Sequence, residues 1–110
     1  MKIINAGNIK TTAAHGAVPR KALIKAGDSK TKLQTVNDAH LDSGQGFEPH
    51  VHEDCEEVYY FIEGEGIMTI NGREIPVGEG ICILVEAGES HGLKNTDKKV
   101  LRFITMRLLI

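Results

Sequence analysis

Two histidines and several acidic residues lie close together in residues 50–66, which read HVHEDCEEVYYFIEGEG. His50 and His52 are separated by one residue. Alternate side chains of an extended strand share a face, with Cα atoms roughly 6.6 Å apart, so two imidazoles at this spacing can bind one cation. For zinc each bond would measure about 2.0–2.1 Å. On this stretch alone, an acidic surface loop that happens to contain histidine explains the pattern at least as well.

Any of four carboxylates after the histidines is close enough in sequence to be a further ligand: Glu53, Asp54, Glu56 and Glu57. If Glu57 faces inward from a strand, Tyr59 and Phe61 share its face. If Glu56 faces inward instead, Val58, Tyr60 and Ile62 share its face. Both sets are plausible barrel residues, so side-chain type leaves the two registers open.

The segments around this stretch predict strands and not helices. Short apolar runs broken by Gly, Asn and Asp recur along the chain, and many are rich in β-branched and aromatic residues. Asn71-Gly72 separates two such runs and is the strongest short-range signal of a hairpin. The predicted strands cover residues 21–25, 32–41, 57–62, 67–70, 73–77, 81–85 and 100–110, with loops over 42–49 and 53–56. Many short strands with frequent turns are typical of an all-β sandwich or barrel.

The length of 110 residues suits one domain. We expect an N-terminal arm over residues 1–17, with a short strand at 2–4, and a single β-barrel domain over 18–110. The net charge is −2 and Lys and Arg are scattered, so nucleic acid and anionic membranes are poor partners. The N-terminus lacks the apolar segment of a signal peptide, and Cys55 and Cys82 do not form a disulfide framework. We therefore expect a reduced, cytoplasmic protein.

Two of the predicted strands, over residues 81–85 and 100–110, are apolar on both faces. In an isolated sandwich one face of each strand should be wet, so an apolar outer face needs a cover. A homodimer would supply that cover and is our expectation. The alternative is that both faces are buried within one chain.

The spacing of residues in two segments extends well beyond the histidine pair. In the first, Gly44 is followed by His50, His52, Glu57 and Gly64 in the pattern G-x5-H-x-H-x4-E-x6-G. In the second, Gly80 is followed by Gly88, His91 and Asn95, the last three in the pattern G-x2-H-x3-N. Together the segments resemble the two motifs of the cupin superfamily, over roughly residues 33–108. One position departs from the pattern, because Glu86 stands where the family has a proline; this affects the rigidity of a turn and not the ligands.

The resemblance implies a cupin-type double-stranded β-helix, or jelly-roll barrel, with one divalent metal held by four ligands: His50, His52, Glu57 and His91. The family spacing selects Glu57 over Glu56, which leaves Glu53 and Asp54 as solvated loop acids. Three neutral imidazoles and one carboxylate suit Mn, Fe, Ni, Co or Zn. A single anionic ligand leaves the site positively charged, which favours an anionic substrate.

With Glu57 inward, Tyr59, Phe61 and Phe103 would line the substrate pocket. Tyr59 would hydrogen-bond the substrate or donate a proton to it, whereas Phe103 is equally well explained as ordinary core. The remaining residues of chemical interest have structural interpretations. We expect His15 and His40 on the surface, Cys55 as an inert or redox-sensitive thiol beside the site, Cys82 in the core, and Asn95 in a turn.

Three functions are compatible with this pattern. The first is a small metalloenzyme of the dioxygenase, decarboxylase, lyase or isomerase type, acting on a small polar or anionic organic molecule. The second is a non-catalytic module that binds a sugar or organic acid, and the third is a structural or storage role. The complete ligand set favours the enzyme, because storage and purely structural cupins often lack one or more ligands.

Overall fold

The computed structural model describes residues 1–14 and 18–110, and the described chain is built almost entirely of strands. The elements are η1 (Ala6–Asn8), β1 (Thr12–Ala14), β2 (Val18–Ile24), β3 (Leu33–Leu41), β4 (Gly46–Val51), β5 (Cys55–Glu63), β6 (Glu65–Ile70), β7 (Arg73–Gly78), β8 (Cys82–Val85), β9 (Ser90–Asn95) and β10 (Leu101–Leu109). No helix of the described residues is long and apolar enough to cross a membrane.

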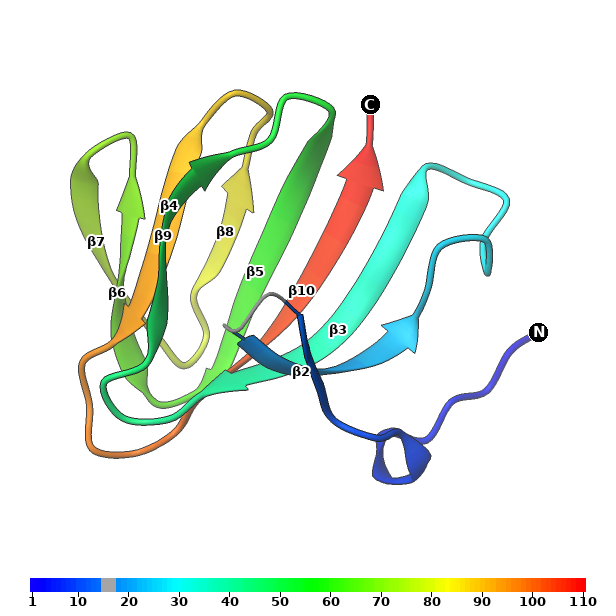
Figure 1. The fold of residues 1–110 in the computed structure, drawn as a ribbon, viewed down its shortest axis with the longest axis horizontal. Coiled ribbons are helices and arrows are strands. Elements are labelled where there is room, and N and C mark those ends of the chain that lie inside the picture. The colour runs from blue at the N-terminus through cyan, green and yellow to red at the C-terminus, as the bar shows by residue number, and fades with distance from the viewer. Residues whose placement is uncertain (15–17) are drawn as a thin grey trace.

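The strands form two antiparallel sheets that face each other. One sheet has six strands in the order β1-β2-β3-β10-β5-β8, and the other has four in the order β4-β9-β6-β7. Figure 1 shows the four-stranded group on one side and β5, β10, β3 and β2 on the other. Neighbouring strands in each sheet are often far apart in sequence, as in a jelly roll, and the all-β expectation is confirmed.

The predicted hairpin at Asn71-Gly72 joins β6 to β7. Asn71 has a φ of 49° and Gly72 a φ of 79°, the pair of positive values that a tight hairpin turn requires. Asn and Gly are the residues that adopt this conformation at least cost. The turn therefore fixes the register in which Ile70 pairs with Arg73.

The core lies between the sheets, where alternate residues of β3, β10 and β5 point inward. On these strands the buried side chains are Ala39, Leu41, Cys55, Tyr59, Phe61, Leu101 and Phe103. The facing sheet adds Met68, Val77 and Leu93, and Val85 of β8 extends the core at the edge of the six-stranded sheet. Tyr59 and Phe61 both point inward, as expected if Glu57 on the same strand points inward.

The N-terminal segment differs from expectation. Residues 2–4 form no strand: they pair with no described strand, and Ile3 is exposed. The first strand is β1, which pairs with β2 and so adds the arm to the edge of the six-stranded sheet. The arm boundary at residue 17 and the prediction for His15 lie outside the described residues.

Two segments that we predicted as loop belong to strands. β4 begins at Gly46, and Phe47 pairs with Leu93 of β9. Its Gly and Pro residues are tolerated because β4 is an edge strand with a register shift between Phe47 and His50. Likewise β5 begins at Cys55, two residues before Glu57.

The strands that are apolar on both faces expose part of their apolar surface in the single chain. Leu84 of β8 is 52% exposed, and Tyr60 of the neighbouring strand β5 is 45% exposed. Cys82 is exposed as well, so its predicted place in the core is wrong. Cys82 and Leu84 share the outer face of β8, an edge strand of the six-stranded sheet, while Val85 faces inward. Burial of both faces within one chain is thereby excluded for β8.

Candidate metal centre

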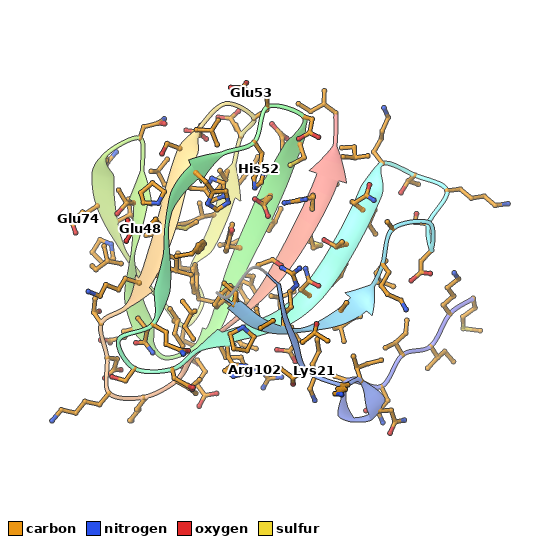
Figure 2. All side chains as sticks on the ribbon, viewed as in Figure 1. Lys21, Glu48, His52, Glu53, Glu74 and Arg102 are labelled. Carbon is orange, nitrogen blue, oxygen red and sulfur yellow. The ribbon has the colours of Figure 1, made fainter. Side chains whose placement is uncertain are left out.

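Both sheets contribute to the predicted ligand set. His50 lies near the end of β4 and pairs in register with His91 of β9, within the four-stranded sheet. His52 follows the last residue of β4, so the histidine pair spans a strand end and not one continuous strand. Glu57 comes from β5 in the opposite sheet. Figure 2 shows His52 pointing between the two groups of strands.

The four side chains converge on one point. Their ligand atoms all lie within 4.8 Å of one another, an arrangement that could hold a metal ion. Glu57 Oε1 lies 3.1 Å from Nε2 of His91 and 3.4 Å from Nε2 of His52. The ring centroids of His50 and His91 are 4.4 Å apart. One carboxylate oxygen thus faces imidazole nitrogens from the opposite sheet.

Backbone carbonyls orient two of the imidazoles. His91 Nδ1 lies 3.3 Å from the oxygen of Glu89, and His50 Nδ1 lies 3.2 Å from the oxygen of Glu48. If each Nδ1 carries its proton toward that carbonyl, Nε2 keeps its lone pair for a cation. The donor set of three neutral imidazoles and one carboxylate fits a divalent transition metal of the Mn, Fe, Co, Ni and Zn series.

The surroundings also hold the ligands in the protonation states that metal binding needs. Burial lowers the pKa of His52, although the charge of Glu57 opposes this, so the imidazole is neutral near pH 7. Burial raises the pKa of Glu57, but in the metal-free site a hydrogen bond from the other tautomer of His91, protonated at Nε2, and the charge of Arg107 outweigh it and hold the pKa below its usual value. The carboxylate is therefore ionised.

The structure agrees with the choice of Glu57 among the acids. Glu57 points inward and is one of the four clustered residues, whereas Glu53 and Asp54 are exposed. Asp54 also belongs to a smaller group with His52 and Cys55 whose ligand atoms lie within 4.8 Å of one another. That group shares His52 with the main cluster. It therefore offers no independent site.

Tyr59 lies beneath the cluster, with its ring centroid 6.1 Å from that of His91. Burial raises the pKa of its phenol, so Tyr59 stays protonated and is suited to donate a hydrogen bond. Phe61 and Phe103 lie deeper, with ring centroids 6.4 Å and 5.9 Å from Tyr59. Both are almost fully buried core residues, so they support Tyr59 from behind.

Two residues near the cluster escaped the sequence analysis. Phe47 packs 5.4 Å from His50, centroid to centroid, but it fell in a segment that we predicted as loop. Arg107 donates from Nη2 to Nε2 of His52 at 3.3 Å. Its parity with Phe103 along one strand could have revealed it, because both must then face inward.

The other predicted residues lie where their chemistry suggests. Cys55 is buried, and burial raises the pKa of its thiol, which disfavours the reactive thiolate. Asn95 is buried and donates from Nδ2 to the oxygens of Leu41 and Lys99, at 3.0 and 2.8 Å. Its Oδ1 accepts from the backbone N–H of Asp97, so Asn95 organises a turn as expected. His40 is outside the cluster.

The family model of the cupin domain matches residues 37–107. This chain belongs to the cupin family. The match runs from the middle of β3 to Arg107 of β10 and includes all four clustered residues. It therefore confirms the family that the two sequence motifs indicated.

Individual relatives extend the comparison. An oxalate-binding protein from Thermotoga maritima is 34% identical over 70 residues, which are 64% of this cupin and 58% of that protein. A crystal structure from Thermotoga maritima, described as a predicted oxalate decarboxylase, has a TM-score of 0.93 and 24% identity over 99% of this chain and 100% of that one. The polyketide cyclase RemF from Streptomyces resistomycificus has a TM-score of 0.85 and 23% identity, covering 98% and 79% of the two chains. The two structures establish the jelly-roll fold alone.

Proposed function

We propose that this cupin holds one divalent transition metal through its four clustered residues and uses it to act on a small organic anion. The observation that carries the proposal is the convergence of His50, His52, Glu57 and His91 from both sheets. A bound metal would supply a Lewis acid that polarises a substrate oxygen. Because Glu57 is the one anionic member of the set, part of the metal charge is left for an anion to neutralise.

The substrate class that we propose is a small carboxylate of the oxalate kind. The support is the 34% identity to a protein named for binding oxalate, although the match spans only 58% of that protein. Tyr59 would then act on the bound anion as a hydrogen-bond donor or proton donor, since its phenol is buried, protonated and beside His91. The reaction would be of the decarboxylase, dioxygenase, lyase or isomerase type.

A non-catalytic role is the second candidate. The relative with 34% identity is named for binding and not for a reaction. In that role the same ligands would hold the metal and the metal would hold the acid. The two candidates therefore share a site and differ only in turnover.

One experiment separates these outcomes. Purified protein is analysed for metal, and oxalate is titrated by calorimetry into metal-loaded and chelator-treated samples. We expect close to one metal per chain and oxalate binding in the loaded sample alone. Aerobic and anaerobic incubation with oxalate and related acids then distinguishes the enzyme from the binder. Protein from metal-replete cells that contains no metal would contradict the proposal in both forms.

We also propose that a second copy covers the exposed apolar residues of β5 and β8, where Tyr60 and Leu84 lie on the outer face. Size measured in solution should correspond to a homodimer. Leu84→Glu should shift it to a single chain.

Both cysteines are free, which agrees with a reducing, cytoplasmic location.

A further inference from the structure

The inner face of β3, β10 and β5 changes character along its length. The pairing of the strands sets inward side chains in rows, and the row in the core consists of Ala39, Phe103 and Phe61. The next row toward the ligands consists of Asn37, Thr105 and Tyr59. The last consists of Thr35, Arg107 and Glu57. Polar groups thus accumulate toward the metal ligands, on strands that also build the core.

Arg107 is the cation of the last row, and it lies against the ligand atoms. Its Nη2 is 3.3 Å from Nε2 of His52, and its Nε is 4.0 Å from Oε2 of Glu57. The side chain is 38% exposed, so solvent and solutes can reach it. The guanidinium therefore sits at the edge of the cluster, on the side from which a ligand could approach.

Arg107 is not paired in the manner of a structural arginine. Arg102, on the same strand, donates from Nε and Nη2 to the two oxygens of Asp38 at 3.0 and 2.7 Å. Arg107 reaches Glu57 only at 4.0 Å, and among the described residues its one hydrogen-bond acceptor is Nε2 of His52. A guanidinium has five N–H donors, so most of those on Arg107 are available.

Metal binding would free the remaining donor as well. The lone pair of His52 Nε2 accepts the hydrogen bond from Arg107 in this structure. An imidazole nitrogen that binds a metal has no lone pair left for a hydrogen bond. In the loaded protein the Nη2 N–H of Arg107 would therefore need another acceptor close to the metal.

We propose that Arg107 is a second anchor for the substrate and that the site selects an anion with two carboxylates. One carboxylate would bind the metal, and the other would accept hydrogen bonds from the guanidinium, for which a carboxylate is the matching planar acceptor. The charges of Arg107 and Glu57 balance each other, which leaves the divalent charge of the metal for a dianion to neutralise. This inference rests on the proposed function. It adds the charge of the substrate and names the residue that recognises the second carboxylate.

The test compares oxalate with oxamate, in which a neutral amide replaces one carboxylate at nearly the same shape. Both are titrated by calorimetry into the metal-loaded wild type, Arg107→Gln, Arg107→Lys and Arg102→Gln. Arg102→Gln is the matched control, because it removes the same charge from the opposite face of the same strand. Figure 2 shows Arg102 and His52 toward opposite ends of the sheets. Metal content is measured for every sample.

We expect Arg107→Gln to keep its metal and to lose about 10- to 100-fold in oxalate affinity, the range for a hydrogen-bonded charged pair. Its oxamate affinity should change much less, so the preference for oxalate over oxamate should collapse. Arg107→Lys should recover part of the preference, because it restores the charge without the planar fork. Arg102→Gln should bind both ligands as the wild type does.

The metal alone already favours the dianion oxalate over oxamate. The test therefore measures how much this preference changes when Arg107 is substituted. A preference for oxalate over oxamate that is as large in Arg107→Gln as in the wild type overturns the second anchor while leaving the metal-dependent function intact. Metal-loaded wild type that binds neither ligand overturns the proposed function and the anchor with it. If Arg107→Gln does not fold, wild type that binds oxamate as tightly as oxalate overturns the anchor by itself.

Discussion

The inner face of the six-stranded sheet has an apolar end and a charged end, and the same three strands build both. At the apolar end Phe61 and Phe103 pair across β5 and β10, with Leu41 and Leu101 beyond them. At the charged end Glu57 and Arg107 pair across the same two strands. The first end is sealed from water, whereas Arg107 at the second is partly exposed and lies beside the partly exposed His52, which follows β4 of the opposite sheet.

The difference indicates that the two ends of each strand have different roles: the apolar end stabilises the fold, and the charged end carries groups for binding. Burial of apolar area stabilises the apolar end, since removal of such area from water favours folding. The charged end carries buried or half-buried polar groups whose desolvation opposes folding unless partners offset it. Rigid packing at one end therefore holds the ligands at the other in position. Substitutions at the two ends should separate stability from metal and ligand binding.

The largest expected effect is at the apolar end. Phe61→Ala should lower the free energy of unfolding by about 3–5 kcal/mol, because it leaves a cavity in a fully buried layer. Urea unfolding of the metal-free protein measures this loss. The folded fraction should still bind one metal per chain, because no ligand has been removed.

The control is Ile3→Ala, at an apolar residue that lies outside the strands and is 86% exposed. It should cost much less stability than Phe61→Ala. Equal losses would mean that the inner layer does not dominate stability and would undermine the comparison.

The next effect is at the charged end. His52→Ala should weaken metal binding at least about 100-fold, since removal of a ligand exceeds the 10- to 100-fold loss typical of a supporting residue. The free energy of unfolding of the metal-free protein should change by less than about 1 kcal/mol, because His52 is partly exposed. Competition with a chelator measures the affinity, and urea unfolding measures the stability.

His40→Ala provides the control, since His40 belongs to the same sheet as Glu57 but lies outside the cluster. It should keep full metal content. A His52→Ala protein that retains metal as tightly as His40→Ala would remove His52 from the ligand set.

The two ends also differ in how far the sequence could predict them. Residue type and spacing identified Glu57 and His91, because a family motif fixes its ligands at constant offsets. Alternation along β5 placed Tyr59 and Phe61 inward. The ligand assignment needed the family motif, whereas the inward placement of Tyr59 and Phe61 needed only the local periodicity of one strand.

Features that depend on neighbouring strands were missed. The parity of Arg107 with Phe103 indicates an inward side chain, but only the pairing of β10 with β5 sets it opposite Glu57. Phe47 lies among turn-forming residues, and only the pairing of β4 with β9 makes that segment a strand. Cys82 has apolar neighbours in sequence, but its exposure follows from the edge position of β8. Strand order is not encoded in local pattern, so the sequence analysis left out Arg107 and Phe47 and placed Cys82 wrongly.

The smallest expected effect is a difference in pH dependence between the ends. Burial lowers the pKa of His52 in the folded state, below the value of about 6.5 that it has when unfolded. Between those two values the unfolded chain binds more protons, so the free energy of unfolding of metal-free protein should fall as pH drops below about 6.5. Glu57, whose folded pKa is also lowered, adds a further loss only at more acidic pH, as its carboxylate is protonated.

Urea unfolding of the metal-free protein at a series of pH values from 7 to 5 measures this slope. His52→Ala should reduce the slope, because the group that takes up the proton is gone. Phe61→Ala should lower the whole curve and leave its slope unchanged, since no titratable group is altered. If the slope is the same in His52→Ala as in the wild type, the proton uptake belongs to groups outside the charged end. The two ends would then differ in burial and ligand chemistry but not in their response to acid.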